Sequence, residues 1–167
     1  MAFTLPHFDL DAFVRSTLAE DLGPTGTDVT SQSVIPADVR FEGTMDSRDA
    51  IVVAGLPIAV AFFSSLDPAM KIDLLVEEGQ RVAAGTDLMR LRGNARAMLT
   101  AERSALNTVQ HLSGIATLTR QYVDAISGTG CTLWIRAKPF PGFACLKNTR
   151  RAWAAQRTTA WDCGTPR

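Results

Sequence analysis

A row of polar residues on one predicted helix offers the clearest chemistry in this sequence. Arg96, Arg103 and Gln110 fall seven residues apart and therefore share one stripe of a helix, while the apolar positions of the same stretch recur on another face. An arginine presents a planar fork of N–H donors that stays charged and pairs bidentately with a carboxylate. Such a row alone is more often a solvated helix face, so an anion-binding function needs further evidence.

The cysteines do not form a metal-binding pattern. Cys131, Cys145 and Cys163 lack the paired spacing that zinc ligands show. We therefore expect no metal site built from them.

Length and composition describe one ordinary globular domain. The chain has 167 residues, of which 46% are hydrophobic and 20% are charged, a balance typical of soluble folded proteins. No segment approaches the roughly 20 apolar residues that cross a membrane, and the first residues do not resemble a signal peptide. We expect a cytoplasmic protein that binds neither membrane nor nucleic acid.

A break in charge divides the chain near Cys131. Of the 17 basic and 17 acidic residues, 7 and 1 follow Cys131, which leaves 10 and 16 before it, so the net charges are −6 before and +6 after. All three tryptophans also follow it. The last part is therefore either a second module, such as a basic nucleic-acid arm or a small cysteine-rich unit, or a segment of different origin.

The order of expected elements predicts an α+β fold. Before residue 77 we expect a helix over 9–18 that stops at 23–24, a turn-rich segment at 26–31, a strand over 39–45, a short β-branched run at 51–55, a buried helix over 57–65 and a strand over 72–76. A long helix follows over 95–112. Ser113 and Gly114 are expected to break it, and a second helix ends at Gly128.

The segment from Glu77 to Leu88 predicts a tight corner between short strands, with Gly79 and Gly85 at its turns. Biotinyl and lipoyl carrier domains have a similar corner, and Ala69-Met70-Lys71 is similar to their modified-lysine motif. In a carrier, however, that lysine lies at a hairpin tip well ahead of the corner. Lys71 enters the corner almost directly, which disfavours the carrier alternative.

Taken together, the motifs before residue 131 resemble those of the quinolinate phosphoribosyltransferase family, and the resemblance covers nearly all of residues 10–131. The matching pieces, in order, are Glu20-Asp21-Leu22-Gly23, Asp28-Val29-Thr30-Ser31, Val53-Ala54-Gly55-Leu56, Leu66-Asp67-Pro68, the Gly79/Gly85 corner, and the helix that contains Thr100-Ala101-Glu102-Arg103-Ser104-Ala105-Leu106-Asn107. Each piece is weak alone, but the ordered set is specific.

The resemblance implies an N-terminal α/β sandwich domain over residues 1–112, and only the start of a truncated α/β barrel over 113–131. It implies a homodimer or a larger homo-oligomer that acts on two small molecules, quinolinate and phosphoribosyl pyrophosphate. The implied products are nicotinate mononucleotide, pyrophosphate and carbon dioxide, made during NAD biosynthesis. A molybdenum-associated family of similar fold shares these features and is kept as an alternative.

The resemblance also implies the site residues. The arginine of the family's T-A-E-R motif binds the dicarboxylate in the neighbouring subunit's site, and here it is Arg103. His111 is a weaker substrate-binding candidate, because the family places a basic residue near that position. Mg²⁺ acts on the pyrophosphate, and its ligands, like the catalytic residues, are not expected in this chain.

Residues 132–167 match the family only in another reading frame. Trp134 to Gly142 can be encoded TGG ATA CGC GCA AAA CCA TTC CCG GGN. Read one base earlier, this gives GAT ACG CGC AAA ACC ATT CCC GGG, or D-T-R-K-T-I-P-G, a family motif. The same shift turns 146–150 into E-K-Y-A and 156–164 into N-H-R-M-G-L-W. We therefore expect an out-of-frame, poorly structured tail and a chain that is inactive as written, with apolar surface exposed on the helices after Ala95.

Resequencing the coding DNA tests this interpretation directly. We expect a net loss of one base near the codons for Gly130 to Trp134, caused either by a deletion in the gene or by a sequencing error. If the resequenced DNA has an intact reading frame with no missing base, the frameshift is contradicted.

Overall fold

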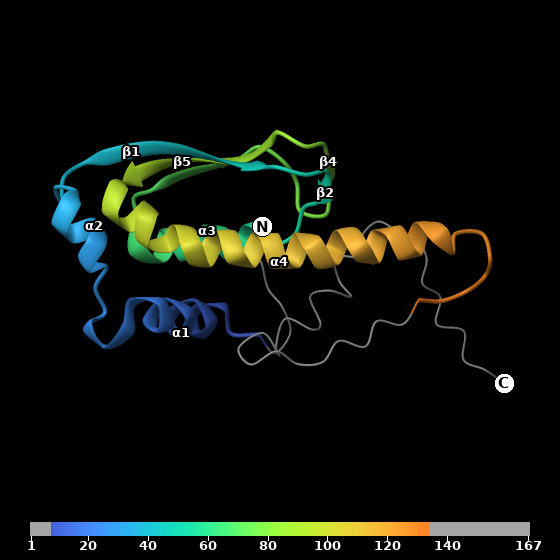
Figure 1. Cartoon of the computed structure of the whole chain (residues 1–167), viewed down its shortest axis with the longest axis horizontal. Helices are drawn as coiled ribbons and strands as arrows, with labels where there is room; N and C mark the ends of the chain where they lie inside the picture. The colour runs from blue at the N-terminus through green and yellow to red at the C-terminus, as the bar shows by residue number, and fades with distance from the viewer. Residues whose placement is uncertain (1–7, 134–167) are drawn as a thin grey trace.

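The computed structural model describes residues 8–133 and confirms the α+β class. A three-stranded antiparallel sheet lies on one side, two helices pack beneath it, and a further helix lies beyond them (Figure 1). The helices are α1 (Leu10–Leu22), η1 (Gly23–Thr25, a 3-10 turn), α2 (Val29–Val34), α3 (Leu56–Leu66) and α4 (Ala95–Ala125). The strands are β1 (Arg40–Ser47), β2 (Ile51–Val52), β3 (Lys71–Leu74), β4 (Arg81–Val82) and β5 (Thr86–Asn94).

β5 is the central strand of the larger sheet, in the order β1-β5-β3, and β2 pairs only with β4. Met89 and Leu91 are buried on the face toward the helices. Arg92 alternates with them on the opposite face, where it forms a 2.9 Å ion pair with Glu42 that remains exposed. The sheet therefore has one solvated face and one face that packs on α3 and α4.

The core lies between this sheet and α3, a helix that is apolar on nearly every side. Ile58, Phe62 and Phe63 are at most 1% exposed. On the far side of α3, the Phe13 ring of α1 meets Phe62 with centroids 6.0 Å apart in an edge-on arrangement. A helix buried on both sides explains why the sequence of α3 lacks a polar stripe.

The segment expected to be only turns contains the short helix α2. Asp28 caps its N-terminus by accepting hydrogen bonds from the Ser31 backbone N–H at 3.0 Å and the Ser31 hydroxyl at 2.6 Å. Asp, Ser and Thr serve turns and helix N-caps equally well, so composition alone does not separate these two structures.

The predicted helix break at Ser113 and Gly114 is wrong, because α4 continues for 31 residues through both positions. The Ser113 hydroxyl accepts a hydrogen bond from the Ala54 N–H at 2.9 Å and donates one to the Ala54 carbonyl at 3.2 Å. Thr117, one turn later, accepts from the Val52 N–H at 2.8 Å. These bonds outweigh the low helix propensity of the Ser-Gly pair. The domain boundary predicted between residues 112 and 113 thus lies inside one helix. Of the predicted tail, residues 132–167, all but the first two residues lie outside the described residues.

Lys71 does not occupy a carrier-type hairpin tip. It is the first residue of β3, where it lies opposite Arg92 of β5, and it follows α3 and a turn rather than another strand. This placement disagrees with the biotinyl or lipoyl carrier alternative.

Gly55 is the point where the chain between β2 and α3 comes closest to α4. Its φ is +102°, and a Cβ added there would lie 3.0 Å from Cδ1 of Leu112 and 3.5 Å from the Thr108 carbonyl oxygen. The backbone conformation therefore favours glycine, and an added Cβ would fit only if the Leu112 side chain moved slightly.

We expect Gly55→Ala to destabilise the fold more than Gly79→Ala. Gly79 also has a positive φ, +79°, but its added Cβ would meet nothing within 4 Å. The Gly79 variant should lose only the conformational cost, about 1–2 kcal/mol. The Gly55 variant should lose roughly a further 1–3 kcal/mol from overpacking against α4. Denaturant unfolding of both variants measures the difference, and equal losses would contradict the close approach.

Candidate functional site

Arg103 lies on the exposed side of α4, in the N-terminal third of the helix. Within residues 8–133 its guanidinium makes no hydrogen bond and no ion pair. A side chain with five N–H donors and a permanent charge is therefore left available for an external anion.

Three other residues of the motif face the opposite way. Ala101 and Ala105 are fully buried, and Ser104 is 3% exposed. The Ser104 hydroxyl donates a short hydrogen bond to the carboxylate of Asp21 at the end of α1. The inner side of the motif thus fastens α1 to α4, and the helical period then directs Arg103 outward.

Arg96 shares the predicted polar stripe with Arg103 but has a different role. Its Nε donates to the Ile35 carbonyl at 2.7 Å, and its terminal nitrogen donates to the Gln32 carbonyl at 3.1 Å. These carbonyls lie at and beside the C-terminal end of α2, where a cation is favourable. Arg96 is committed to holding α2 in place, so the predicted stripe contains one structural arginine and one available arginine.

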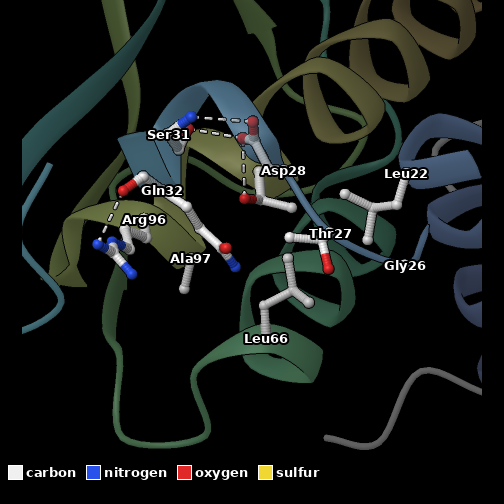
Figure 2. Close-up of a pocket in the computed structure, with 10 residues that line it drawn as sticks. Leu22, Gly26, Thr27, Asp28, Ser31, Gln32, Leu66, Arg96 and Ala97 are labelled. Atoms are coloured by element: carbon white, nitrogen blue, oxygen red, sulfur yellow. Dashed lines mark hydrogen bonds between the residues drawn. The ribbon is translucent and has the colours of Figure 1, made fainter. Parts of the chain in front are cut away.

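A cavity of about 180 Å³ opens between α2, the start of α4 and the end of α3 (Figure 2). Asp28 lies at its edge, and hydrogen bonds from Ser31 hold the pKa of that carboxyl below its usual range. A third hydrogen bond comes from the Thr100 hydroxyl at 3.2 Å. The carboxylate already joins α2 to α4, so we interpret this cavity as a structural junction rather than a reaction site.

His111 is exposed on α4, eight residues after Arg103. At about 1.5 Å per residue this places it roughly 12 Å further along the helix axis, on a neighbouring flank. The structure therefore does not bring His111 and Arg103 to one point, and a substrate role for His111 stays a prediction.

Comparison with known proteins identifies the family. The model of the quinolinate phosphoribosyl transferase N-terminal domain matches residues 28–113, just over half of the chain. The chain belongs to the quinolinate phosphoribosyltransferase family. The match begins at Asp28, the cap of α2, and includes the motif around Arg103.

Relatives from several kingdoms agree with this family. The chloroplastic nicotinate-nucleotide pyrophosphorylase [carboxylating] of Arabidopsis thaliana is 39% identical over 82% of this chain and 38% of its own length. The probable enzyme of the same name from Synechocystis is 39% identical over 85% of this chain and 47% of its own length. The nicotinate-nucleotide pyrophosphorylase structure from Francisella tularensis superposes with a TM-score of 0.80 and 31% identity, covering 90% of this chain and 52% of that one. The chain thus spans about half or less of the length of these relatives.

The described part of this quinolinate phosphoribosyltransferase family member contains no grouping of His, Cys, Asp and Glu that could hold a metal ion. None of its helices within residues 8–133 is long and apolar enough to span a membrane. Residues 8–133 therefore do not form an Mg²⁺ site.

Glu78 is a partly buried acid that the sequence did not single out. One carboxylate oxygen accepts from the Gly55 N–H at 2.6 Å, and the other accepts from the Leu56 N–H at 3.1 Å, so Glu78 caps α3 from a distant loop. Burial raises the pKa of Glu78 to about 7, although the two N–H groups favour the charged form. No local pattern reveals this contact, because its partners are backbone groups more than twenty residues upstream.

The raised pKa of Glu78 predicts a pH-dependent stability. The folded chain holds this proton more tightly than the unfolded chain, whose carboxyl titrates near 4.5. The contribution is therefore complete below pH 4.5 and is lost as the pH rises through about 7. The loss is on the order of 3 kcal/mol. Unfolding at several pH values should show this slope in the wild type and in Glu77→Gln, and Glu78→Gln should lack it. Identical slopes in Glu78→Gln and wild type would contradict the assignment.

Proposed function

We propose that this chain supplies the N-terminal domain and one substrate arginine of an enzyme that makes nicotinate mononucleotide. Quinolinate and phosphoribosyl pyrophosphate are the substrates, and pyrophosphate and carbon dioxide are released. The observation that carries the proposal is Arg103, an exposed guanidinium that makes no hydrogen bond and no ion pair within residues 8–133, while Ala101, Ser104 and Ala105 of the same motif are buried. The nicotinate-nucleotide pyrophosphorylase names of the relatives support the same reaction.

The chemistry of the substrate suits this residue. Quinolinate carries two adjacent carboxylates, and a guanidinium fork binds a carboxylate through two parallel hydrogen bonds. Arg103 projects away from its own domain, so we propose that it completes the site of a neighbouring subunit in a homodimer or larger homo-oligomer. Its contribution is to position and neutralise the dicarboxylate beside the phosphoribosyl donor.

The remaining requirements of the reaction belong to parts outside the described residues. We propose that Mg²⁺ enters with phosphoribosyl pyrophosphate and that its ligands come from the barrel. We also propose that the protein acts in the cytoplasm. The relatives favour this function over the molybdenum-associated alternative, because those named above are nicotinate-nucleotide pyrophosphorylases.

Turnover measurements test the role of Arg103. The coding sequence should be expressed with one base restored between the codons for Gly130 and Trp134, and nicotinate mononucleotide formation should be measured. We expect Arg103→Ala to lower kcat/KM for quinolinate about 10- to 100-fold, because a charge-assisted hydrogen bond is worth roughly 1.5–3 kcal/mol. Arg15→Ala, which removes another exposed arginine, on α1, is the matched control and should leave kcat/KM unchanged. Full activity of Arg103→Ala would exclude the proposed role.

The 167-residue chain as written should show no turnover in the same assay, because it lacks the family's barrel motifs in frame. Measurable turnover by that chain would show that residues 132–167 have been misinterpreted.

A further inference from the structure

The N-terminal third of α4 is tied to the segment before β1 by side chains that all donate in the same direction. Arg96, Thr100 and Ser104 are spaced by four residues and therefore share one flank of the helix. Their acceptors all lie in residues 21–35: the Asp21 carboxylate for Ser104, the Asp28 carboxylate for Thr100, and the Gln32 and Ile35 carbonyls for Arg96. This segment thus follows the beginning of α4 (Figure 1).

Ser104 is the anchor beside Arg103. It is 3% exposed, whereas its acceptor, Asp21, is exposed at the end of α1. Ala101 and Ala105, which are buried next to it, each carry only a methyl group. Apolar burial has no preferred direction, whereas a hydrogen bond to a carboxylate is directional and roughly twice as strong as a bond between neutral groups. The bond from Ser104 to Asp21 therefore defines the rotation of this turn more sharply than its packing does.

The anchors at Ser113 and Thr117 lie much further from Arg103. They bond to the chain between β2 and α3, and they follow Arg103 by 10 and 14 residues. At about 1.5 Å per residue, these separations are roughly 15 and 21 Å along the helix axis. Long helices bend gently. Anchors at that distance therefore set the direction of the guanidinium less closely than a bond within the same turn.

We propose that Asp21 is a positioning residue for Arg103. By holding Ser104 on the inner side of α4, its carboxylate fixes the rotation of the turn that carries the guanidinium. A guanidinium binds a carboxylate through two parallel bonds only when the two planar groups are aligned, so the rotation of that turn decides how well Arg103 can bind. The proposal deepens the proposed function, since it rests on Arg103 binding quinolinate, and it names a residue of another helix on which this binding depends.

Steady-state kinetics of the enzyme expressed with one base restored test the proposal. We expect Asp21→Ala and Ser104→Ala each to raise KM for quinolinate about tenfold. The values of kcat and of KM for phosphoribosyl pyrophosphate should stay within about twofold of wild type, because the lost interaction serves quinolinate binding alone. Asp21→Asn keeps an acceptor oxygen for Ser104 and should return KM to within about threefold of wild type. Glu20→Ala removes the neighbouring exposed carboxylate of α1 and is the matched control, with unchanged KM.

Combined substitutions decide whether Asp21 acts through Arg103. In an Arg103→Ala background, the further change Asp21→Ala should alter kcat/KM for quinolinate by less than about twofold, because the residue that it positions is gone. Asp21→Ala and Ser104→Ala together should have no larger effect than either change alone, since both remove the same bond. A purely structural role would instead lower kcat for both substrates and would add to the effect of Arg103→Ala.

Each result has a defined meaning. Wild-type KM in both single variants, a loss confined to kcat, or additive effects in the Arg103→Ala background would overturn the positioning role and leave the proposed function standing. If Asp21→Ala does not fold, Ser104→Ala decides, because it removes the same bond and leaves the exposed Asp21 carboxylate in water. Full activity of Arg103→Ala, or a frame-restored enzyme without turnover, would remove the proposed function and the positioning role with it.

Discussion

The fold depends on how the buried backbone between β2 and α3 finds hydrogen-bond partners. β2 is only two residues long and pairs with a strand of the same length, so the sheet satisfies few of its polar groups. The side chains of Ser113 and Thr117 on α4 supply the missing partners at Ala54 and Val52. Buried amides left unpaired would be costly. These contacts fix both the rotation of α4 and its position along its own axis.

Once α4 is fixed in this way, the two sides of its motif are separated. Ala101 and Ala105 must face the core, and Ser104 must meet Asp21. The helical period leaves Arg103 on the outside, where water solvates its charge. The outward position of Arg103 therefore follows from packing on the opposite side of the helix.

The parts of the fold with a local signal could be predicted, and the rest depends on distant partners. Apolar periodicity located α1, a continuous apolar run located α3, and the resemblance alone singled out Arg103. The apparent break at Ser113 failed because its hydroxyl bonds to Ala54, 59 residues earlier. Glu78 was missed for the same reason, and the residues around Asp28 were expected to form only turns. Helix caps and buried polar contacts are set by tertiary structure, which composition does not encode.

The uninterrupted length of α4 has a mechanical consequence. At about 1.5 Å per residue, a helix of 31 residues is roughly 46 Å long. Because the helix is not interrupted at Ser113 and Gly114, a rotation of its C-terminal end also moves the backbone at Arg103. The arginine and the segment that follows Ala125 therefore cannot adjust independently. A contact that sets the orientation of the C-terminal end of α4 therefore also sets the direction in which the guanidinium of Arg103 projects.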